Sequence, residues 1–347
     1  MKKYISLLTF CFLIISNPAS YSYSTVSIIE SEGNPSDLKV LMIVDNAFGY
    51  TYFLVKNYLE SWGINVITAS ATGSKLVTGC YNQPPNSTTA DILISDITNI
   101  TEYDAIHIPS GGHWKSLIGK TEVLDLIKQA YNNQVIVSAL CIGLKVLAKA
   151  EIIKNVRMCG HPLAQADVTL AEGIYMDERV VVDQRIISGG FGGGVRRYDE
   201  APNFEMSYML TKNMLGYSPF TDLEINATKD NIGIKVSLNN MDPFNEIVDN
   251  AYNLTDVHLN FRTTDKENLL VKSYLLVNTG TGFEKNIQDL DEGKYSIELA
   301  FEDKNGCLEF YPNLMIVDTR SNKIPGFTIF LGFITIFMIA FYRKRQK

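Results

Sequence analysis

The chain has 347 residues, of which 46% are hydrophobic and 20% are charged. This balance is typical of folded proteins and excludes a chain that is disordered throughout, and the length allows two ordinary domains. The formal net charge is −7, and no basic stripe with interleaved aromatic residues occurs, so nucleic acid is not expected as a partner.

The first 22 residues have the pattern of a secretory signal peptide. Two lysines precede an apolar run from Ile5 to Ile15, and small residues suited to cleavage follow it. The run is too short to span a bilayer. We therefore expect residues 1–22 to be removed, with retention as an N-terminal anchor as the alternative. A polar lead-in, residues 23–37, comes next.

Residues 38–217 alternate between apolar runs typical of buried strands and segments with helical spacing. The predicted strands are 39–44, 64–67, 105–109, 134–140 and 156–159, with a hairpin at 179–182 and 185–188. The predicted helices are 50–62, 121–131 (with Thr121 as its cap), 142–153 and 203–215. This alternation predicts an α/β fold with a doubly wound, mostly parallel, flavodoxin-like sheet, and a ligand site at the carboxyl ends of its strands.

Cys141 lies at the junction between the predicted strand 134–140 and the helix that follows it. A reactive atom at such a junction lies at the mouth of an α/β sheet, where backbone N–H groups and the positive end of a helix dipole converge. That setting is expected to lower the pKa of the thiol and to favour the nucleophilic thiolate. Cys141 is therefore a candidate nucleophile, or a redox-sensitive thiol.

Residues 221–318 show alternating patterns instead of helical spacing. The predicted strands are 232–238, 257–261, 269–277, 295–301 and 308–317. Turn residues separate these short strands, a spacing that predicts an antiparallel β-sandwich similar to immunoglobulin or fibronectin domains. We expect this all-β domain to be a spacer or an adhesive element.

The C-terminal segment has the pattern of a membrane anchor. After a linker, residues 319–325, the uncharged segment 326–342 would form a helix about 25 Å long, close to the thickness of the hydrocarbon core. The basic tail, residues 343–347, predicts a cytoplasmic end, with everything before it outside the cell membrane. The Pro-Gly-Phe sequence at 325–327 also resembles the sorting tails of archaeal surface proteins, which are processed and replaced by a lipid. A buried core helix fits a chain end with a basic stop poorly.

Sequons and cysteines also bear on the predicted location outside the cell. Four Asn-x-Ser/Thr sequons, which are candidate glycosylation sites, agree with it: Asn86, Asn99, Asn226 and Asn253. The cysteines do not form a dense disulfide framework, although a Cys80–Cys159 bridge is possible. Cys159 and His161 lie two residues apart, but no second pair of metal ligands accompanies them, so no metal site is expected.

Four segments between residues 38 and 216 resemble the ThiJ/PfpI superfamily, within the class I glutamine-amidotransferase-like fold. They are residues 103–112, 137–143, 160–163 and 181–190. The resemblance implies a nucleophilic cysteine at Cys141, no cofactor, a small-molecule ligand or substrate, and often a homodimer. It is closest to the branch containing the parkinsonism-associated deglycase, where a His-Pro-Leu sequence follows the cysteine by about twenty residues, as at His161 here.

The residues around Cys141 suggest individual roles. Gly111 and Gly112 can bring backbone N–H groups close to a bound oxygen, because no side chain intervenes, and with the N–H of Ile142 they would form an oxyanion site. His161 is a candidate general acid or base, or it orients a ligand. His113 is expected to line the mouth of the pocket. His107, within an apolar strand, reads as a core or edge residue.

One family feature is missing. The resemblance implies a Glu in the loop after the first strand that hydrogen-bonds the cysteine, but residues 46–52 contain no carboxylate, and Asp45 lies several residues early. The alignment places Tyr50 or Thr51 near the thiol, and a hydroxyl cannot serve as a general base at neutral pH. Two hypotheses follow. One is a Cys-dependent hydrolase or lyase that acts on small carbonyl or acyl compounds, and the alternative is a non-catalytic ligand-binding or redox-sensing surface module.

Overall fold

The computed structural model describes residues 22–27, 33–82, 84–190, 200–227, 232–238, 254–265, 267–291 and 293–318. Most of the predicted signal peptide, the predicted linker, the segment 326–342, the basic tail and Asn253 lie outside these ranges. None of the helices within the described ranges combines the length and the apolar character that a membrane crossing requires.

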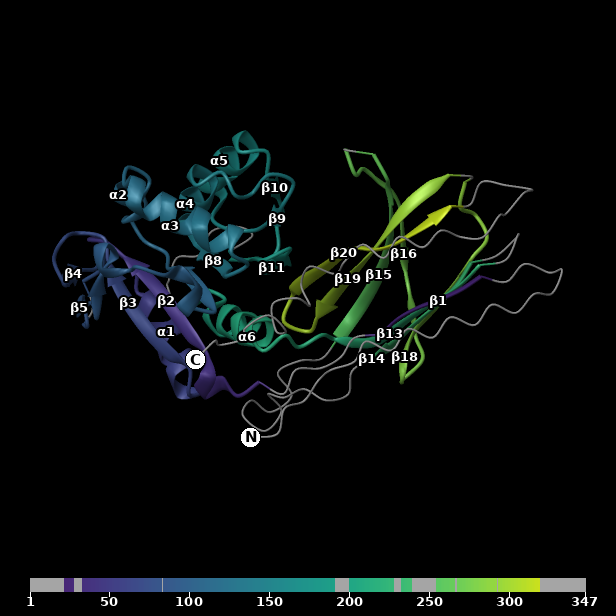
Figure 1. Cartoon of the computed structure of the whole chain (residues 1–347), viewed down its shortest axis with the longest axis horizontal. Helices are drawn as coiled ribbons and strands as arrows, with labels where there is room; N and C mark the ends of the chain where they lie inside the picture. Colours follow the sequence, from purple (N-terminus) through teal and green to yellow (C-terminus); the bar gives the residue numbers. More distant parts are fainter. Residues whose placement is uncertain are drawn as a thin grey trace.

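An 11-stranded sheet runs through both halves of the described chain (Figure 1), in the order β16-β15-β19-β20-β11-β12-β8-β7-β2-β3-β6. Its α/β half consists of β2 (Lys39–Val44), β3 (Asn65–Ser70), β6 (Ile92–Leu93), β7 (Ala105–Ile108), β8 (Ile136–Leu140), β11 (Val180–Asp183) and β12 (Ile186–Gly189). Neighbouring strands from β12 to β6 are parallel, and β11 forms an antiparallel hairpin with β12.

Helices cover both faces of this parallel sheet. On one face lie α1 (Thr51–Ser61) and α6 (Asn203–Met214), and on the other lie α2 (Trp114–Leu117), α3 (Thr121–Asn132), α4 (Leu144–Lys149) and α5 (Gln165–Leu170). Strand β2 shows why its sequence is apolar after Lys39: Leu41 and Ile43 enter one core, whereas Met42 enters the other. The predicted α/β, flavodoxin-like fold is confirmed.

Short elements complete the α/β half. The strands are β4 (Leu76–Thr78), β5 (Ser87–Thr89), β9 (Arg157–Met158) and β10 (Ile174–Tyr175), and the 3₁₀ turns are η1 (Pro35–Asp37), η2 (Ile94–Asp96), η3 (Ile100–Glu102), η4 (Cys141–Gly143) and η5 (Pro162–Ala164). Two local details differ from expectation. Thr121 is the first residue of α3 rather than its cap, which is Lys120 and forms no side-chain cap bond. The helix after Cys141 begins with η4 and ends at Lys149, because residues 150–155 form turns, with a left-handed backbone at Glu151 and Asn155.

The C-terminal half is β-rich. A five-stranded sheet packs on the end of the long sheet. Its strand order is β1 (Ser22–Ser27), β13 (Phe220–Ala227), β14 (Ile232–Leu238), β18 (Gly282–Ile287) and β17 (Val277–Asn278). The end of the long sheet consists of β15 (Leu254–Thr263), β16 (Leu270–Leu275), β19 (Lys294–Asp303) and β20 (Cys307–Asp318). Aromatic rings fill the space between the sheets, as where Phe220 stacks on Phe301 at 5.3 Å. The assignment of this region to the immunoglobulin or fibronectin class stays a prediction.

Two strands of the five-stranded sheet come from segments in which the sequence shows no clear strand pattern. Strand β1 lies in the predicted polar lead-in and pairs with β13 along its whole length, from Ser22 with Ala227 to Ser27 with Asp222. Strand β18 contains three polar or charged residues in a row, Glu284 to Asn286. Both strands are therefore held by pairing with neighbours that are distant in sequence.

The two halves share one sheet because β20 pairs in parallel with β11, from Val180 with Cys307 to Asp183 with Phe310. An edge strand with unpaired N–H and C=O groups is a site for pairing with other chains, and β20 covers this one. The β-rich half is therefore joined to the α/β half by main-chain hydrogen bonds, and not by a linker alone.

Buried ion pairs reinforce this seam. Arg157, on β9, donates to both carboxylate oxygens of Asp183 at 2.9 and 3.1 Å, and to both oxygens of Glu298, on β19, at 2.7 and 2.6 Å. Lys212, on α6, pairs with Glu309 on β20, and both side chains are nearly inaccessible to solvent. Charges in such surroundings are tolerated only when they are paired.

Candidate functional site

The loops that follow the parallel strands β2 and β7 meet at the carboxyl edge of the sheet. The Gly49 N–H donates to the Ser110 carbonyl at 2.7 Å. Gly111 has φ of +119°, and a Cβ on it would lie 2.2 Å from the Gly49 nitrogen, so only glycine fits there. The backbone that approaches Gly111 so closely is therefore the loop after β2. The oxyanion role predicted for the glycine pair depends mainly on Gly112, which is partly exposed.

The third loop, after β8, carries Cys141. This residue has φ of +61°, in the left-handed region that side chains other than glycine seldom adopt. A sharp turn of this kind between a strand and a helix holds a nucleophile at the mouth of a sheet. The side chain is partly exposed, and part of it packs on the core cluster of α1 and α6. The predicted elbow is present in the backbone.

Two further segments close around Cys141. A Cβ on Gly160 would lie 2.8 Å from the Cys141 carbonyl oxygen, and a Cβ on Gly190 would lie 2.2 Å from the Cα of Gly160. The main chains of these segments are therefore in direct contact, which requires glycine at both positions. This packing brings His161, the residue after Gly160, to the neighbourhood of Cys141.

The thiol differs from the expected thiolate. Burial raises the pKa of Cys141 to about 11, and a hydrogen bond from the Ile142 N–H to the sulfur only partly offsets this effect. The helix dipole gives little help, because the thiol lies on the three-residue turn η4 and not at the first turn of a long helix. At neutral pH the sulfur is therefore protonated, contrary to the prediction from sequence.

His161 is partly exposed, and the tautomer of its ring follows from its contacts. The Leu163 N–H donates to Nδ1 at 3.1 Å, so in the neutral ring Nε2 carries the hydrogen. Burial and the nearby charge of Lys145 lower the pKa of this imidazole, which keeps it neutral at physiological pH. In this arrangement His161 can donate a hydrogen bond to a ligand oxygen, but it cannot accept the proton of the thiol without a change of tautomer.

The position of the missing Glu is occupied by hydroxyl groups that bond to one another. Thr51 is buried, its Oγ1 lies 2.7 Å from the Ser110 Oγ, and it also accepts the Ser110 N–H at 3.0 Å. Tyr50 packs its ring on Phe53 and Tyr81, at centroid distances of 5.6 and 5.2 Å. Thr51 therefore joins the loops after β2 and β7, and within the described ranges neither residue forms a hydrogen bond with the Cys141 sulfur.

Asp45, the carboxylate nearest in sequence to the missing Glu, has other partners. It accepts hydrogen bonds from the Asn46 N–H at 2.7 Å and from the Ser116 hydroxyl at 2.5 Å, and Lys120 lies 3.5 Å away. These contacts direct the carboxylate toward α2, so it does not replace the absent acid.

The other two histidines of the α/β half, His107 and His113, are interior. His113, expected at the mouth of the pocket, is 1% exposed: its Nε2 donates to the Pro109 carbonyl at 2.9 Å, and its Nδ1 accepts the Asp45 N–H at 3.3 Å. Burial lowers its pKa to about 4, so it is neutral and joins the same two loops. His107 is fully buried and bonds to Ser138 at 2.8 Å, in agreement with its expected place in the core.

Other side chains beside the elbow carried no recognisable sequence motif. Lys145, one helical turn after Cys141, pairs with Asp167 at 2.9 Å, and its ammonium lies 4.5 Å from the centre of the Trp114 ring. Tyr175 donates to the Gly160 carbonyl at 2.6 Å. The spacing of Lys145 from Cys141 on one helix could have suggested it, but Trp114, Asp167 and Tyr175 come from separate elements that only the fold brings together.

The remaining sequence candidates are placed as follows. Asn86 and Asn99 are exposed, and nothing is described of the side chain of Asn226. No disulfide bond joins the cysteines of the described residues, and Cys80 is exposed whereas Cys159 is buried, so the possible bridge between them is not formed. Within the described ranges, no group of three or more His, Cys, Asp or Glu side chains is arranged to hold a metal ion.

The chain resembles known proteins over its α/β half. Residues 38–196 match the DJ-1/PfpI family. The uncharacterized protein MJ0967 of Methanocaldococcus jannaschii is 32% identical over 164 residues, which cover 46% of this chain and 78% of that protein. Protein DJ-1 homolog D of Arabidopsis thaliana is 26% identical over 113 residues, which cover 31% of this chain but only 29% of the plant protein.

Solved structures give a similar but weaker match. The ThiJ/PfpI domain protein from Brachyspira murdochii superposes with a TM-score of 0.45 at 21% identity, covering 54% of this chain and the whole of that one. DJ-1beta of Drosophila melanogaster has a TM-score of 0.45 at 18% identity, covering 52% of this chain and 91% of that one. With its nucleophile elbow on a doubly wound α/β sheet, the chain belongs to the DJ-1/PfpI family through residues 38–196.

Proposed function

We propose that the protein acts through Cys141 on small carbonyl or acyl compounds. The observation that carries this proposal is the left-handed backbone of Cys141, a partly exposed residue, which sets the sulfur beside the Ile142 N–H at the carboxyl edge of the sheet. The family membership of residues 38–196 supports it, since a nucleophilic cysteine at this position is what the resemblance implies.

The proposed step is the addition of the thiol to an aldehyde or ketone. A bond forms between the sulfur and the carbonyl carbon, the π electrons of the C=O bond move to oxygen, and the thiol proton ends on that oxygen to give a hemithioacetal. The N–H groups of Ile142 and Gly112, together with Nε2–H of His161, would stabilise the charge that develops on the oxygen. The net step neither takes up nor releases a proton, because the proton that leaves the sulfur ends on the oxygen of the adduct.

With methylglyoxal, turnover requires two further steps. A proton moves from the carbinol carbon of the hemithioacetal to the neighbouring carbonyl carbon, which gives a thioester. Water then hydrolyses this thioester to lactate and the free thiol.

The test is turnover of methylglyoxal by the full chain. The parent protein is expected to consume it, and Cys141→Ala is expected to reduce consumption to the rate without protein, because the attacking atom is gone. Cys80→Ala, which removes an exposed thiol from the same half, serves as the matched control and should keep the parent rate. Equal rates for the parent and Cys141→Ala would reject the proposal.

A second candidate is a non-catalytic ligand-binding or redox-sensing module. It is favoured by the raised pKa of Cys141 and by the hydroxyl pair, Thr51 and Ser110, in place of a carboxylate. In that case methylglyoxal would not be consumed, but it would protect Cys141 from alkylation if the ligand is a carbonyl compound. Selective formation of a sulfenic or sulfinic acid at Cys141 under mild peroxide would indicate a redox sensor.

We also propose that the protein is carried at the outer face of the cell membrane. The support is in the sequence alone: the signal-like N-terminus, the apolar segment 326–342, the basic tail and the sequons. A chain that ends at residue 318 is expected to leave the membrane fraction, whereas the full chain stays with it after a high-salt wash. Recovery of the full chain in the soluble fraction of its host would contradict this location.

A further inference from the structure

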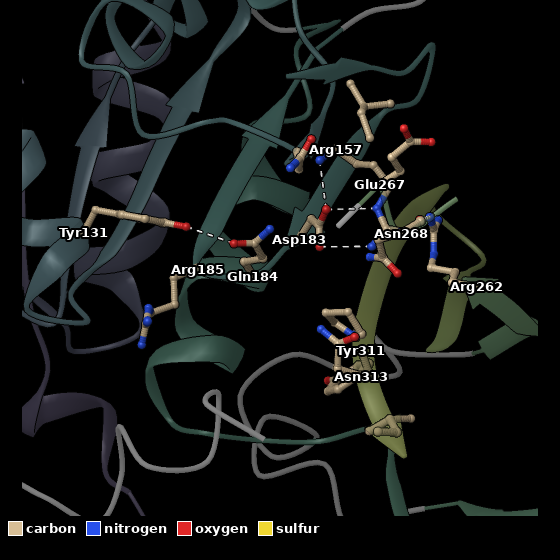
Figure 2. A pocket seen from close by; sticks show the side chains of 14 residues that line it. Tyr131, Arg157, Asp183, Gln184, Arg185, Arg262, Glu267, Asn268, Tyr311 and Asn313 are labelled. Atoms are coloured by element: carbon tan, nitrogen blue, oxygen red, sulfur yellow. Dashed lines mark hydrogen bonds and ion pairs between the residues drawn. The ribbon is translucent and has the colours of Figure 1, made fainter. Parts of the chain in front are cut away.

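A cleft of about 320 Å³ opens at the seam between the two halves (Figure 2). It lies at the opposite edge of the parallel sheet from Cys141. Gln184 and Arg185, which line it, form the turn between β11 and β12, and the next residue, Ile186, pairs with Val137 near the start of β8. Cys141 follows the other end of the same strand, so the cleft is separate from the elbow.

One of the charged side chains that line the cleft, Arg185, has no partner of opposite charge within the described ranges. Asp183 is paired with Arg157, and Arg262 is paired with Glu298 at 3.1 Å. The Arg185 side chain forms no hydrogen bond or ion pair among the described residues, and its Nε and Nη1 are buried, although the residue as a whole is partly exposed. Burying N–H groups without an acceptor is costly, and the Nε and Nη1 of this guanidinium therefore favour a ligand that can accept from them.

The carboxylate that is left among the lining residues, Glu267, is exposed. Figure 2 shows it on the far side of the cleft from Tyr131 and Arg185. It therefore does not supply the acceptor that Arg185 lacks, and the positive charge of Arg185 on the α/β wall is not balanced by a lining carboxylate in the part of the chain that the structure describes.

Amide groups from both halves add further donors. The Gln184 Oε1 accepts the Tyr131 hydroxyl at 2.9 Å, and the Asn313 Oδ1 accepts the Ser296 hydroxyl at 2.8 Å. Each amide oxygen is thereby occupied, which leaves the NH₂ group of each residue able to donate. Figure 2 shows Gln184 and Arg185 on the α/β wall and Asn313 on the β-rich wall.

We propose that this cleft binds a small organic oxyanion, a carboxylate or a phosphate monoester, with Arg185 as its charged ligand and the NH₂ groups of Gln184 and Asn313 as neutral donors. The volume is in the range of known small-molecule sites, and such sites are common where two domains meet. Since the ligand contacts both walls, its binding stabilises the contact between the two halves.

The test is thermal unfolding of the purified full chain with three anionic probes, inorganic phosphate, glucose 6-phosphate and gluconate, and with neutral glucose. At least one anion is expected to raise the Tm saturably, and glucose is not. Arg185→Met should lower the affinity for that anion at least about tenfold, because a hydrogen bond to a charged group is lost. Arg179→Met, which removes an equal charge from an exposed ion pair with Glu205 outside the cleft, should bind as the parent does.

Two more variants make the result decisive. Arg185→Lys keeps the charge without the planar fork and should bind with intermediate affinity. Asn313→Ala tests the contribution of the opposite wall to anion binding. If Arg185→Met lowers the Tm of the protein without ligand, the affinity of Asn313→Ala for the anion decides whether the cleft is the binding site. Cys141→Ala should bind the anion normally, so this proposal stands or falls apart from the proposed function. Failure of every anion to shift the parent, or equal affinity of Arg185→Met and the parent, would overturn it.

Discussion

Replacing Arg157 by methionine is expected to destabilise the folded chain by roughly 3–5 kcal/mol, because it removes the cation shared by two buried carboxylates. Asp183 and Glu298 are each 1% exposed, and neither can be solvated where it lies. Burial alone would raise the pKa of Glu298, and the hydrogen bonds from Arg157 more than offset this, so the pKa lies below its ordinary value. The midpoint of urea unfolding of the full chain, followed by tryptophan fluorescence, measures the loss.

The control is a solvent-exposed ion pair of similar geometry on the same protein. Lys154 and Glu172 lie 2.6 Å apart, both 63% exposed, so Lys154→Met should cost at most about 1 kcal/mol. In the triple variant Arg157→Met, Asp183→Asn, Glu298→Gln, no charge of this trio stays buried, and part of the stability should return. A midpoint for Arg157→Met that matches the one for Lys154→Met would show that the network does not stabilise the seam.

The thiol of Cys141 is expected to react with iodoacetamide roughly one hundredfold more slowly at pH 7.5 than a thiol of ordinary pKa, since only the thiolate attacks and the pKa is raised to about 11. The rate should keep rising beyond pH 9 without a plateau. Burial favours the protonated form in the folded state only, so the unfolded chain loses this proton first. The contribution of Cys141 to stability is therefore full below about pH 8.5 and is lost as the pH rises toward 11.

Mass spectrometry of peptides separates Cys141 from the other thiols in this measurement. Exposed Cys80 is the internal comparator and should be labelled first, whereas Cys159 and Cys307 are buried and should stay unlabelled in the folded chain. A plateau of the Cys141 rate below pH 8 would mean that the site stabilises a thiolate after all. It would contradict the protonated resting state and favour a catalytic nucleophile over the binding module.

Much of the α/β half could be predicted because its signals are local. The run Lys39–Val44 is apolar after its first residue, and it forms a strand buried on both faces, with both ends as expected. The Cys141 elbow and the position of His161 followed from short motifs in a fixed order. The state of the thiol could not be predicted in this way, because the sign of its pKa shift depends on how much burial competes with a short turn.

The features that escaped prediction depend on contacts between distant segments. Neither β11 nor β20 has a pattern that specifies the other as its neighbour, although each was expected as a strand. His113 follows a glycine pair and could equally have faced a pocket, and its burial is decided by Pro109 and Asp45. Likewise, Arg185 is an ordinary polar residue at a turn until the β-rich half closes the cleft around it.

The pairing of β11 with β20 also orders events as the chain is made. The α/β half leaves the ribosome first, but the strand that completes its sheet, Cys307–Asp318, is synthesised more than a hundred residues after β11. Until then the border of that sheet is open, and Arg157 has only one of its two carboxylates. The α/β half can therefore complete its folding only after β20 has been synthesised. Deleting β20 is expected to destabilise the α/β half, although the two are far apart in the sequence.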